Sequence, residues 1–244
     1  MSSAPPSTLD CAILGGGPAG CSAAAWGAQL GLKVGLFERA ETLCPNLAAL
    51  DFAQESLLGH PGETLAAQGK RYAAHLAALR VPISLNARLE HLDWQVDAGW
   101  TLHLAGQPPI HARALLLATG LRPRRPEQLF PASKHVLDAL SLTAQRARLK
   151  PGRVLLLGGG DNAVENALFL AERGHQVTIW SRSDWRAQAA FTRRLVESSI
   201  ERRSATPLPT RVTADAEGVT VQSTMHGEER FDHLAVLLGY EPEP

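Results

Sequence analysis

The chain has 244 residues, of which 45% are hydrophobic and 20% charged, as is usual for a globular protein of one or two domains. Its 24 Lys and Arg balance its 24 Asp and Glu, and this zero formal charge argues against nucleic acid or a membrane surface as a partner. No apolar run approaches the roughly 18 residues of a membrane span, and no signal peptide opens the chain. The three cysteines suit a reducing compartment, and no residues have metal-ligand spacing. We expect a cytoplasmic protein without a metal site, with a disordered tail over residues 1–8.

The first segment, "LDCAILGGGPAGCSAAAWGAQLGLKVGLFE", predicts a buried strand, a glycine turn, an Ala-rich helix and a second buried strand. Gly15, Gly17 and Gly20 fit the pattern G-x-G-x-x-G, which permits a tight turn, a close approach of the backbone to a pyrophosphate, and close helix packing. The helix N-terminus offers unpaired N–H groups to the phosphates. Glu38 follows the second strand, where a carboxylate accepts a hydrogen bond from an adenosine ribose hydroxyl. The segment therefore predicts a dinucleotide site.

The middle of the chain predicts a helix over residues 66–79 and antiparallel strands over 89–113, which Ala-Gly and Gly-Gln-Pro-Pro interrupt. The run "ALLLATG" at 114–120 predicts a further buried strand. The proline-rich, basic segment "LRPRRPEQLFPASK" then marks a crossing into a second domain.

The second domain repeats the plan in "GRVLLLGGGDNAVENALFLAERGHQVTIWSRSDWRA", where Gly158, Gly160 and Ala163 fit G-x-G-x-x-A. Its second strand ends without an acid and is followed by Arg182 and Arg186. Arginines at this place accommodate the 2′-phosphate of NADP; the alternative is a solvated loop. A meander and a closing buried strand, "HLAVLLG", complete the domain.

These paired motifs resemble the two-dinucleotide-binding flavoproteins, and within them the thioredoxin reductase-like group. "AILGGGPAGCSAA" resembles the FAD fingerprint of that group, and "LLGHPGE" the stretch before its helix. "ATGLRPR" resembles its domain crossover, and "GGGDNAVENALFLAERGHQVTIWSR" its NADPH fingerprint. The resemblance implies an α/β fold of two Rossmann-like, three-layer ββα domains. The FAD-binding domain would span 9–120 and the NAD(P)H-binding domain 121–239, with a C-terminal tail over 240–244.

The resemblance also implies the cofactor-binding residues. Those in the first half are Gly15, Gly17, Pro18, Ala19, Gly20, Glu38, Arg39, Asn46, Thr119 and Gly120. Those in the second half are Gly158, Gly160, Asp161, Asn162, Ala163, Glu165, Arg182 and Arg186, with Glu165 near the nicotinamide. The cofactors would be FAD and NADPH, and the protein a flavin-dependent NADPH oxidoreductase, with dimerisation through the FAD domain as a family expectation.

Two departures from the group shape the expected function. The stretch before the second fingerprint, "SKHVLDALSLTAQRARLKPG", has no C-x-x-C, so a dithiol relay from flavin to thioredoxin is not expected. The electron acceptor would instead be a small redox protein, a quinone or oxygen. The chain also stops at "LLGYEPEP", where the group returns to the FAD domain with a strand and a helix, so we expect an FAD domain without that return.

Two other functions stay open. The chain could be a non-catalytic dinucleotide sensor, or a module that a partner completes. Alternatively, Cys44, in the loop after Glu38, could serve as the single catalytic cysteine of a peroxidase or disulfide reductase, although a lone loop cysteine is more often inert. Cys11 and Cys21 are expected to be packing residues.

Overall fold

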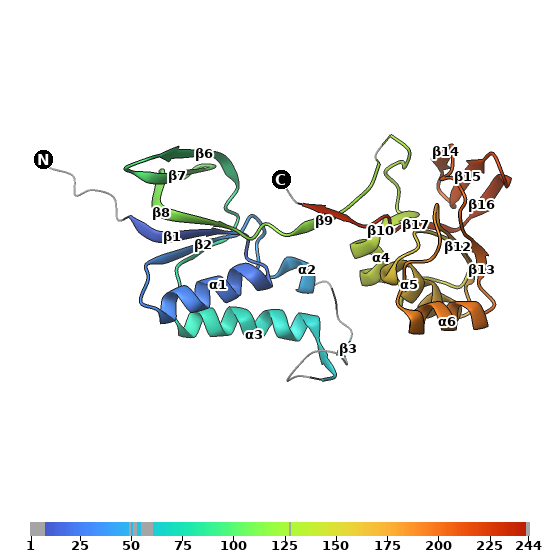
Figure 1. Cartoon of the computed structure of the whole chain (residues 1–244), viewed down its shortest axis with the longest axis horizontal. Helices are drawn as coiled ribbons and strands as arrows, with labels where there is room; N and C mark the ends of the chain where they lie inside the picture. Colours follow the sequence, from blue (N-terminus) through green and yellow to red (C-terminus); the bar gives the residue numbers. More distant parts are fainter. Residues whose placement is uncertain (1–7, 49, 51–52, 55–60, 127, 243–244) are drawn as a thin grey trace, which may run out of the picture. The chain divides into compact units, whose positions relative to one another are not determined.

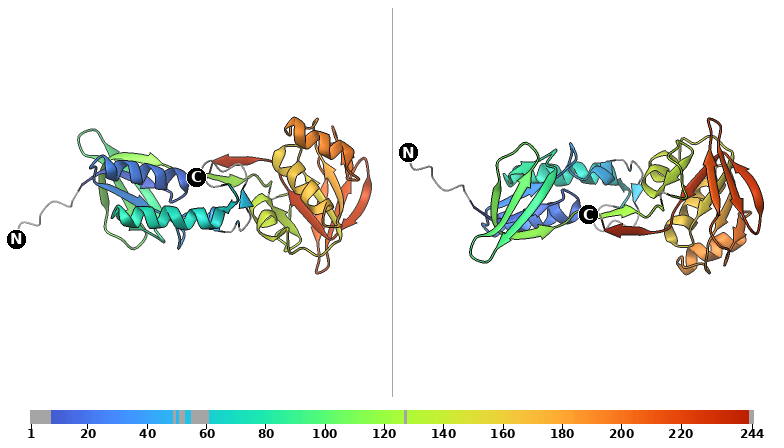
Figure 2. Two further views of the ribbon diagram at one scale, coloured as in Figure 1. Left: turned by 90° about the horizontal axis from the view of Figure 1, so that it is seen from below. Right: turned by 90° about the horizontal axis from the view of Figure 1, so that it is seen from above.

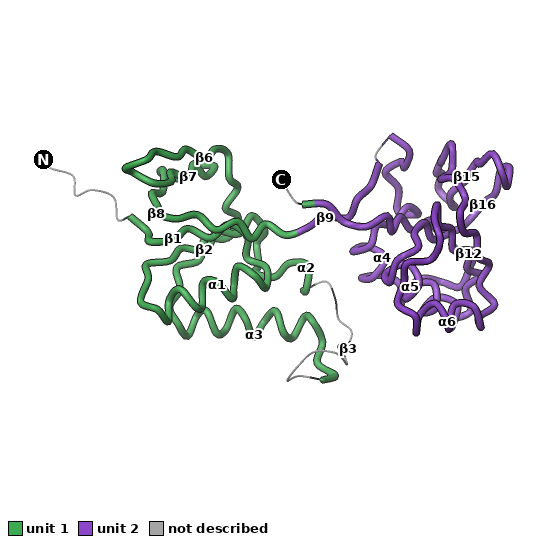
Figure 3. The backbone as a smooth tube through the Cα atoms, viewed as in Figure 1, with its two compact units in different colours: residues 1–120, 242–244 green, residues 121–241 purple. Residues whose placement is uncertain are grey.

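A computed structural model of the chain describes residues 8–48, 50, 53–54, 61–126 and 128–242. Residues 1–7 of the expected tail over 1–8, and residues 57–60 of "LLGHPGE", lie outside the described residues. The chain divides into two compact units, residues 1–120 with 242–244 (unit 1) and residues 121–241 (unit 2), shown in Figure 3. No helix in the described part of the chain is long and apolar enough to cross a bilayer.

Unit 1 is built on a six-stranded sheet in the order β5-β2-β1-β8-β7-β6. Its strands are β1 (Leu9–Leu14), β2 (Val34–Phe37), β5 (Ile83–Ser84), β6 (Leu89–Gln95), β7 (Gly99–Leu104) and β8 (Ile110–Leu117), beside a small pair, β3 (Ala53–Gln54) and β4 (Glu63–Thr64). Its helices are α1 (Pro18–Gln29), α2 (Pro45–Ala48) and α3 (Leu65–Ala78). Strands β5, β2, β1 and β8 run parallel, whereas β7 and β6 are antiparallel.

The alternation of side chains along β1 gives this unit two cores. Ile13 packs with α1 and α3 on one face of the sheet, whereas Ala12 and Leu14 pack with Leu102 of β7 on the other, because successive strand residues point to opposite faces. Figures 1 and 2 show α1 and α3 side by side along one face. This is the expected three-layer arrangement.

Strand β8 differs from its prediction as a buried strand over residues 114–120. It begins at Ile110, and its end is exposed, with 64% of Leu117 accessible. The reason is its pairing: β1 lies beside it as far as Leu117, but β7 pairs only with residues 110–112. Beyond Ala112, no other described strand pairs with that edge.

Unit 2 repeats the three layers. Its parallel sheet has the order β10-β17-β11-β12-β13, and a second, antiparallel sheet has the order β14-β15-β16. The strands of the parallel sheet are β10 (Val136–Asp138), β11 (Arg153–Leu157), β12 (Gln176–Trp180), β13 (Glu201–Arg203) and β17 (His233–Val236). Those of the antiparallel sheet are β14 (Arg211–Ala214), β15 (Val219–Ser223) and β16 (Gly227–Phe231). The helices are α4 (Ala139–Gln145), α5 (Asp161–Ala171) and α6 (Ala189–Glu197).

Alternation along β11 separates the two cores of unit 2. Val154 and Leu156 pack with the helices, while Leu155 and Leu157 pack with the antiparallel sheet. The chain at 240–242 is not the tail that the sequence predicts. It forms β18 (Tyr240–Pro242), which pairs with β9 (Leu121–Pro123), and the Glu241 carboxylate accepts a hydrogen bond from Arg122 Nε at 2.8 Å.

Candidate functional site: two glycine turns at helix N-termini

A cavity of about 390 Å³ lies in unit 2 where β11 ends and α5 begins. This is the carboxyl edge of a parallel sheet, where open α/β folds bind their ligands. Most of the residues that the sequence predicts for the second dinucleotide line it: Gly158, Gly160, Asp161, Asn162, Ala163, Arg182 and Arg186. The structure thus brings together residues that are up to 28 positions apart in the chain.

The start of α5 is shaped for a phosphate. Its N-cap residue is Gly160, which provides no side-chain cap for the first N–H groups of the helix. A Cβ at Gly160 would meet nothing within 4 Å, and the backbone there is extended, a conformation that any residue can adopt. Protein packing therefore does not require glycine at this position. A pyrophosphate bound against the helix N-terminus would require it, because only glycine lets the backbone approach that closely.

The loop after β12 brings two cations to the same cavity. The side chains of Arg182 and Arg186 are exposed, and neither has an ion-pair partner among the described residues. Two contacts hold the loop against the glycine turn: Arg186 N donates to Gly159 O at 2.7 Å, and Gln188 N donates to Asp161 Oδ1 at 2.6 Å. The loop also contains Asp184, but of its charged residues only the two arginines line the cavity, so the loop presents positive charge to it, which suits a phosphate.

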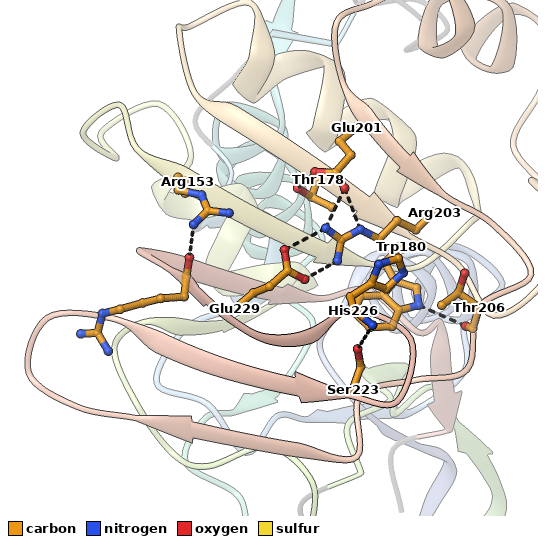
Figure 4. A network of polar contacts seen from close by, with 10 residues as sticks. Arg153, Thr178, Trp180, Glu201, Arg203, Thr206, Ser223, His226 and Glu229 are labelled. Atoms are coloured by element: carbon orange, nitrogen blue, oxygen red, sulfur yellow. Dashed lines mark hydrogen bonds and ion pairs between the residues drawn. The ribbon is translucent and has the colours of Figure 1, made fainter.

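Contacts behind the end of β12 fix where this loop begins (Figure 4). The indole of Trp180 is fully buried, and its Nε1 donates to Thr206 O at 3.1 Å. The guanidinium of Arg203 lies 5.5 Å from the Trp180 ring and bonds both oxygens of Glu229 and one oxygen of Glu201. The Arg203 guanidinium lowers the pKa of Glu229, and the two carboxylates raise the pKa of Arg203.

Glu165 does not join the cavity. It lies on α5 but is not a lining residue, and its Oε1 is 3.1 Å from Nη1 of Arg146. The Arg146 side chain is buried, donates also to Asn166 Oδ1 at 2.9 Å, and stacks on the Phe169 ring. The carboxylate of Glu165 thus partly neutralises a buried cation, a role that its sequence position did not indicate.

The first glycine turn, in unit 1, has the same construction. Gly15 has a φ of +104°, and a Cβ there would lie 2.2 Å from Ala118 O, so both the turn and the close approach of β8 require glycine. The N-cap of α1 is Gly17, again without a side-chain cap and with nothing within 4 Å of a Cβ. Pro18 occupies the first helical turn, where its missing N–H costs nothing. This turn fits a second pyrophosphate.

Glu38 lies beside this turn, but its carboxylate is already engaged. Oε2 accepts from Gly16 N at 2.6 Å, and Oε1 accepts from Ala40 N at 2.8 Å, with the residue only 6% exposed. An ionised carboxylate has about four acceptor positions, so each oxygen retains a lone pair for a ribose hydroxyl. Glu38 therefore also braces the turn.

The remaining predicted residues of unit 1 lie around the same turn at differing distances. Thr119 N comes within 3.0 Å of a Cβ placed on Gly15, and Gly120 follows it. Arg39 and Asn46 are exposed, Arg39 after β2 and Asn46 within α2. Ala19 and Gly20 are in the first turn of α1. No cluster of three or more potential metal ligands occurs in the described part of the chain.

Cys44 is not the lone loop thiol that the sequence indicates. It is buried, its N donates to Gly16 O at 2.9 Å, and its Sγ lies 3.9 Å from Sγ of Cys21. Cys21, expected to be only a packing residue, is therefore one half of a thiol pair next to the glycine turn.

With both turns described, comparison with known proteins is decisive. The family described as pyridine nucleotide-disulphide oxidoreductase matches residues 9–244. The chain belongs to this family. It is an FAD-dependent NAD(P)H oxidoreductase with FAD and NADPH as cofactors, as the sequence predicts.

Individual members of the family agree with this. The chain is 31% identical to the ferredoxin–NADP reductase of Gluconacetobacter diazotrophicus, over 98% of this chain and 74% of that protein. It is 30% identical to the ferredoxin–NADP reductase of Salinispora tropica, over 86% of this chain and 63% of that protein, so it spans less than two thirds of the second relative. The crystal structure of Lactococcus lactis thioredoxin reductase superposes with a TM-score of 0.80 at 24% identity, covering 97% of this chain and 79% of that one. The likeness to this structure confirms the predicted fold class.

Sequence reasoning missed several residues that line the cavity at the second turn, among them Ser181 and Tyr240. Tyr240 Oη accepts a hydrogen bond from Asn162 Nδ2 at 3.0 Å. Ser181 could have been found, since it directly follows the strand that ends at Trp180. Tyr240 could not, because only the pairing of β18 with β9 brings it there.

Proposed function

We propose that unit 2 binds NADPH in the cavity at the second glycine turn and that Arg182 and Arg186 select it over NADH. The observation that carries this proposal is the pair of exposed, unpaired guanidinium groups lining the same cavity as the uncapped start of α5. The α5 N–H groups would hold the pyrophosphate, and the arginines the 2′-phosphate. Asp184, the carboxylate of this loop, does not line the cavity, and both oxygens of Asp161, at the start of α5, already accept hydrogen bonds from Gln188.

Unit 1 would bind FAD at the first glycine turn. The uncapped start of α1 faces the open space at Gly17 and fits the FAD pyrophosphate, while the free lone pairs of Glu38 fit the adenosine ribose. The chemistry that FAD would supply there is acceptance of a hydride from NADPH and onward transfer of the electrons. The residues of this chain contribute the placement of the cofactor and the electrostatics around it.

The acceptor we propose is a ferredoxin-like small redox protein. Support comes from the relatives, which are named ferredoxin–NADP reductases. It also comes from the positions of the three cysteines, 11, 21 and 44, none of which form a C-x-x-C pair. Quinone and oxygen are the competing acceptors of an NADPH-reduced flavin.

The test uses the full chain with added FAD. A flavin absorbance band that co-purifies or is retained after gel filtration, and that bleaches anaerobically at much lower NADPH than NADH, supports the proposal. Adding an oxidised ferredoxin, a water-soluble quinone or oxygen in separate cuvettes then identifies the acceptor that restores the band fastest.

The same experiment separates the non-catalytic function. A chain that binds 2′,5′-ADP but retains no flavin at excess FAD would be a dinucleotide-binding module and not a complete reductase. If oxygen or a quinone reoxidises the flavin fastest, that compound and not a ferredoxin is the acceptor. The proposal for the NADPH site would then still stand.

A further inference from the structure

Two thiols from different elements of unit 1 meet beside the first glycine turn. Cys21 lies in the first turns of α1, and Cys44 directly precedes α2. Their Sγ atoms are 3.9 Å apart, although the residues are 23 positions apart in the chain, and only 3% of Cys21 and 1% of Cys44 is exposed. The contact comes from the tertiary fold and not from a local motif.

The surrounding backbone holds both sulfur atoms in place. Both thiols point at the same acceptor, Gly16 O, at 3.3 Å from Cys21 Sγ and 3.5 Å from Cys44 Sγ. Cys44 has a φ of +51°, a left-handed conformation that L residues rarely adopt. Its backbone N–H also bonds Gly16 O, and a Cβ on Gly69 of α3 would come within 3.3 Å of the Cys44 Cβ. These contacts therefore hold Cys44 in its unfavourable backbone conformation.

The two sulfur atoms differ in their hold on a proton. The hydrogen bond between them lowers the pKa of Cys44 and raises the pKa of Cys21. Burial and the Glu38 carboxylate raise both. Cys44 thus releases its proton more readily than Cys21, which suits it to attack a sulfenic acid formed on Cys21.

One of the two thiols is next to a surface cavity. A cavity of about 330 Å³ between α1 and α3 is lined by Cys21, with Trp26 and Gln29 from α1 and with Tyr72 and His75 from α3. Cys44 does not line it. A small molecule can therefore approach the pair from the cavity between α1 and α3, on the Cys21 side. Figure 1 shows these two helices below the sheet.

We propose that Cys21 and Cys44 are a redox-active dithiol that a small hydroperoxide, entering through this cavity, oxidises to an intramolecular disulfide. The Cys21 sulfur, which lines the cavity, attacks the terminal peroxide oxygen, and the Cys21 proton passes to the leaving oxygen. The O–O bond breaks, and the alcohol or water leaves, which makes a sulfenic acid on Cys21. The Cys44 sulfur then attacks the Cys21 sulfur, the S–S bond forms, and the sulfenic oxygen leaves as water.

The balance is two thiols and one hydroperoxide giving one disulfide, one alcohol (or water) and one water. Closing the sulfur separation from 3.9 Å to the roughly 2.05 Å of an S–S bond is a movement of about 2 Å shared by both side chains. The disulfide would tie α1 to the segment before α2 across the Gly16 carbonyl. This activity is independent of the proposed flavin function, because it needs neither dinucleotide.

The test is a thiol count on the intact chain after treatment with equimolar hydrogen peroxide. The chain is then denatured, alkylated before and after reduction with dithiothreitol, and mapped by peptide mass spectrometry. We expect the number of free thiols to fall from three to one. A link that dithiothreitol reverses should join the peptides of Cys21 and Cys44, and Cys11 should stay free. Cys11, which is half-buried, serves as the internal control.

Two matched variants separate the thiol pair from its access route. Cys11→Ser should form the disulfide at the wild-type rate, whereas Ala25→Leu, which fills the cavity without changing a thiol, should slow its formation severalfold. Peroxide treatment of the urea-unfolded chain shows whether any selectivity comes from the fold. Oxidation of Cys11 as fast as Cys21, links only between separate chains, or an unchanged count would each overturn the proposal.

Discussion

The carboxylate of Glu38 accepts a hydrogen bond from the backbone N–H of Gly16 at 2.6 Å, so the residue that ends β2 braces the turn that ends β1. The other carboxylate oxygen accepts from Ala40 N at 2.8 Å. An acid at this position therefore shapes the turn before any ligand arrives, and the loss of this acid has consequences for folding as well as for binding.

Glu38→Gln should destabilise unit 1. Both carboxylate oxygens accept from N–H donors, and the glutamine amide can offer an oxygen to only one of them while its NH2 group faces the other. The variant loses a charged hydrogen bond, and its NH2 group faces a backbone N–H donor. Together these effects should lower the free energy of unfolding by about 1.5–3 kcal/mol. Urea unfolding measures this, with exposed Glu41→Gln as the control; an equal effect of the two substitutions would remove the bracing role.

Gly17→Ala and Gly160→Ala form a matched pair of tests for the two phosphate sites. Both positions have extended backbone and open space around a Cβ, so neither alanine clashes in the apoprotein. The lower entropy of the unfolded chain favours alanine, whereas the N-cap position favours glycine, and the two effects oppose one another. A methyl group between helix and pyrophosphate should weaken binding about tenfold or more.

The two alanines should differ in which ligand they affect. Fluorescence titration should show weaker FAD binding for Gly17→Ala with NADPH unaffected, and the reverse for Gly160→Ala. Melting temperatures of both variants should stay within a few degrees of that of the wild type. Weakened binding of the same ligand in both variants would contradict the assignment of one dinucleotide to each unit.

Arg182→Gln and Arg186→Gln should each reduce the preference for NADPH. Each substitution removes a charged hydrogen-bond donor to the 2′-phosphate, which costs about tenfold in affinity. Binding of 2′,5′-ADP and of 5′-AMP, measured by calorimetry, should show the loss for the first ligand only. Arg193→Gln, on an exposed position of α6 outside the cavity, should leave both affinities unchanged.

Glu229→Gln should change both the stability of unit 2 and its pH dependence. The bond from Arg203 lowers the pKa of Glu229 in the folded chain. The contribution of Glu229 is therefore complete above the unfolded pKa of about 4.3 and is lost as the pH falls through the lower, folded value. In the variant, Arg203 keeps Glu201, so we expect a loss of about 1–3 kcal/mol at pH 7.

Unfolding free energies measured between pH 7 and pH 3 test this. The difference between wild type and Glu229→Gln should shrink as the pH falls below the unfolded pKa, because protonation of Glu229 removes its charge. Exposed Glu228→Gln is the control. A difference that persists unchanged at pH 3 would show that the Arg203–Glu229 charge pair is not its cause.

The sequence by itself determined the repeated β-α-β plan, the family, and the glycines and arginines at the second turn. Glycine spacing and buried strands are local signals, since a strand, a tight turn and a helix start depend on residues close together in the chain. That is why Gly158, Gly160, Arg182 and Arg186 could be predicted and then lie around one cavity.

The tertiary structure alone decided what depends on contacts between distant residues. It pairs Glu165 with Arg146 outside the cavity, places Tyr240 within it through β18, and exposes the end of β8 beyond its pairing with β7. It also sets Cys21 beside Cys44. The physical reason is the same for each: hydrogen bonds, ion pairs and sulfur contacts across many residues depend on how the elements pack, and local sequence patterns do not encode that packing.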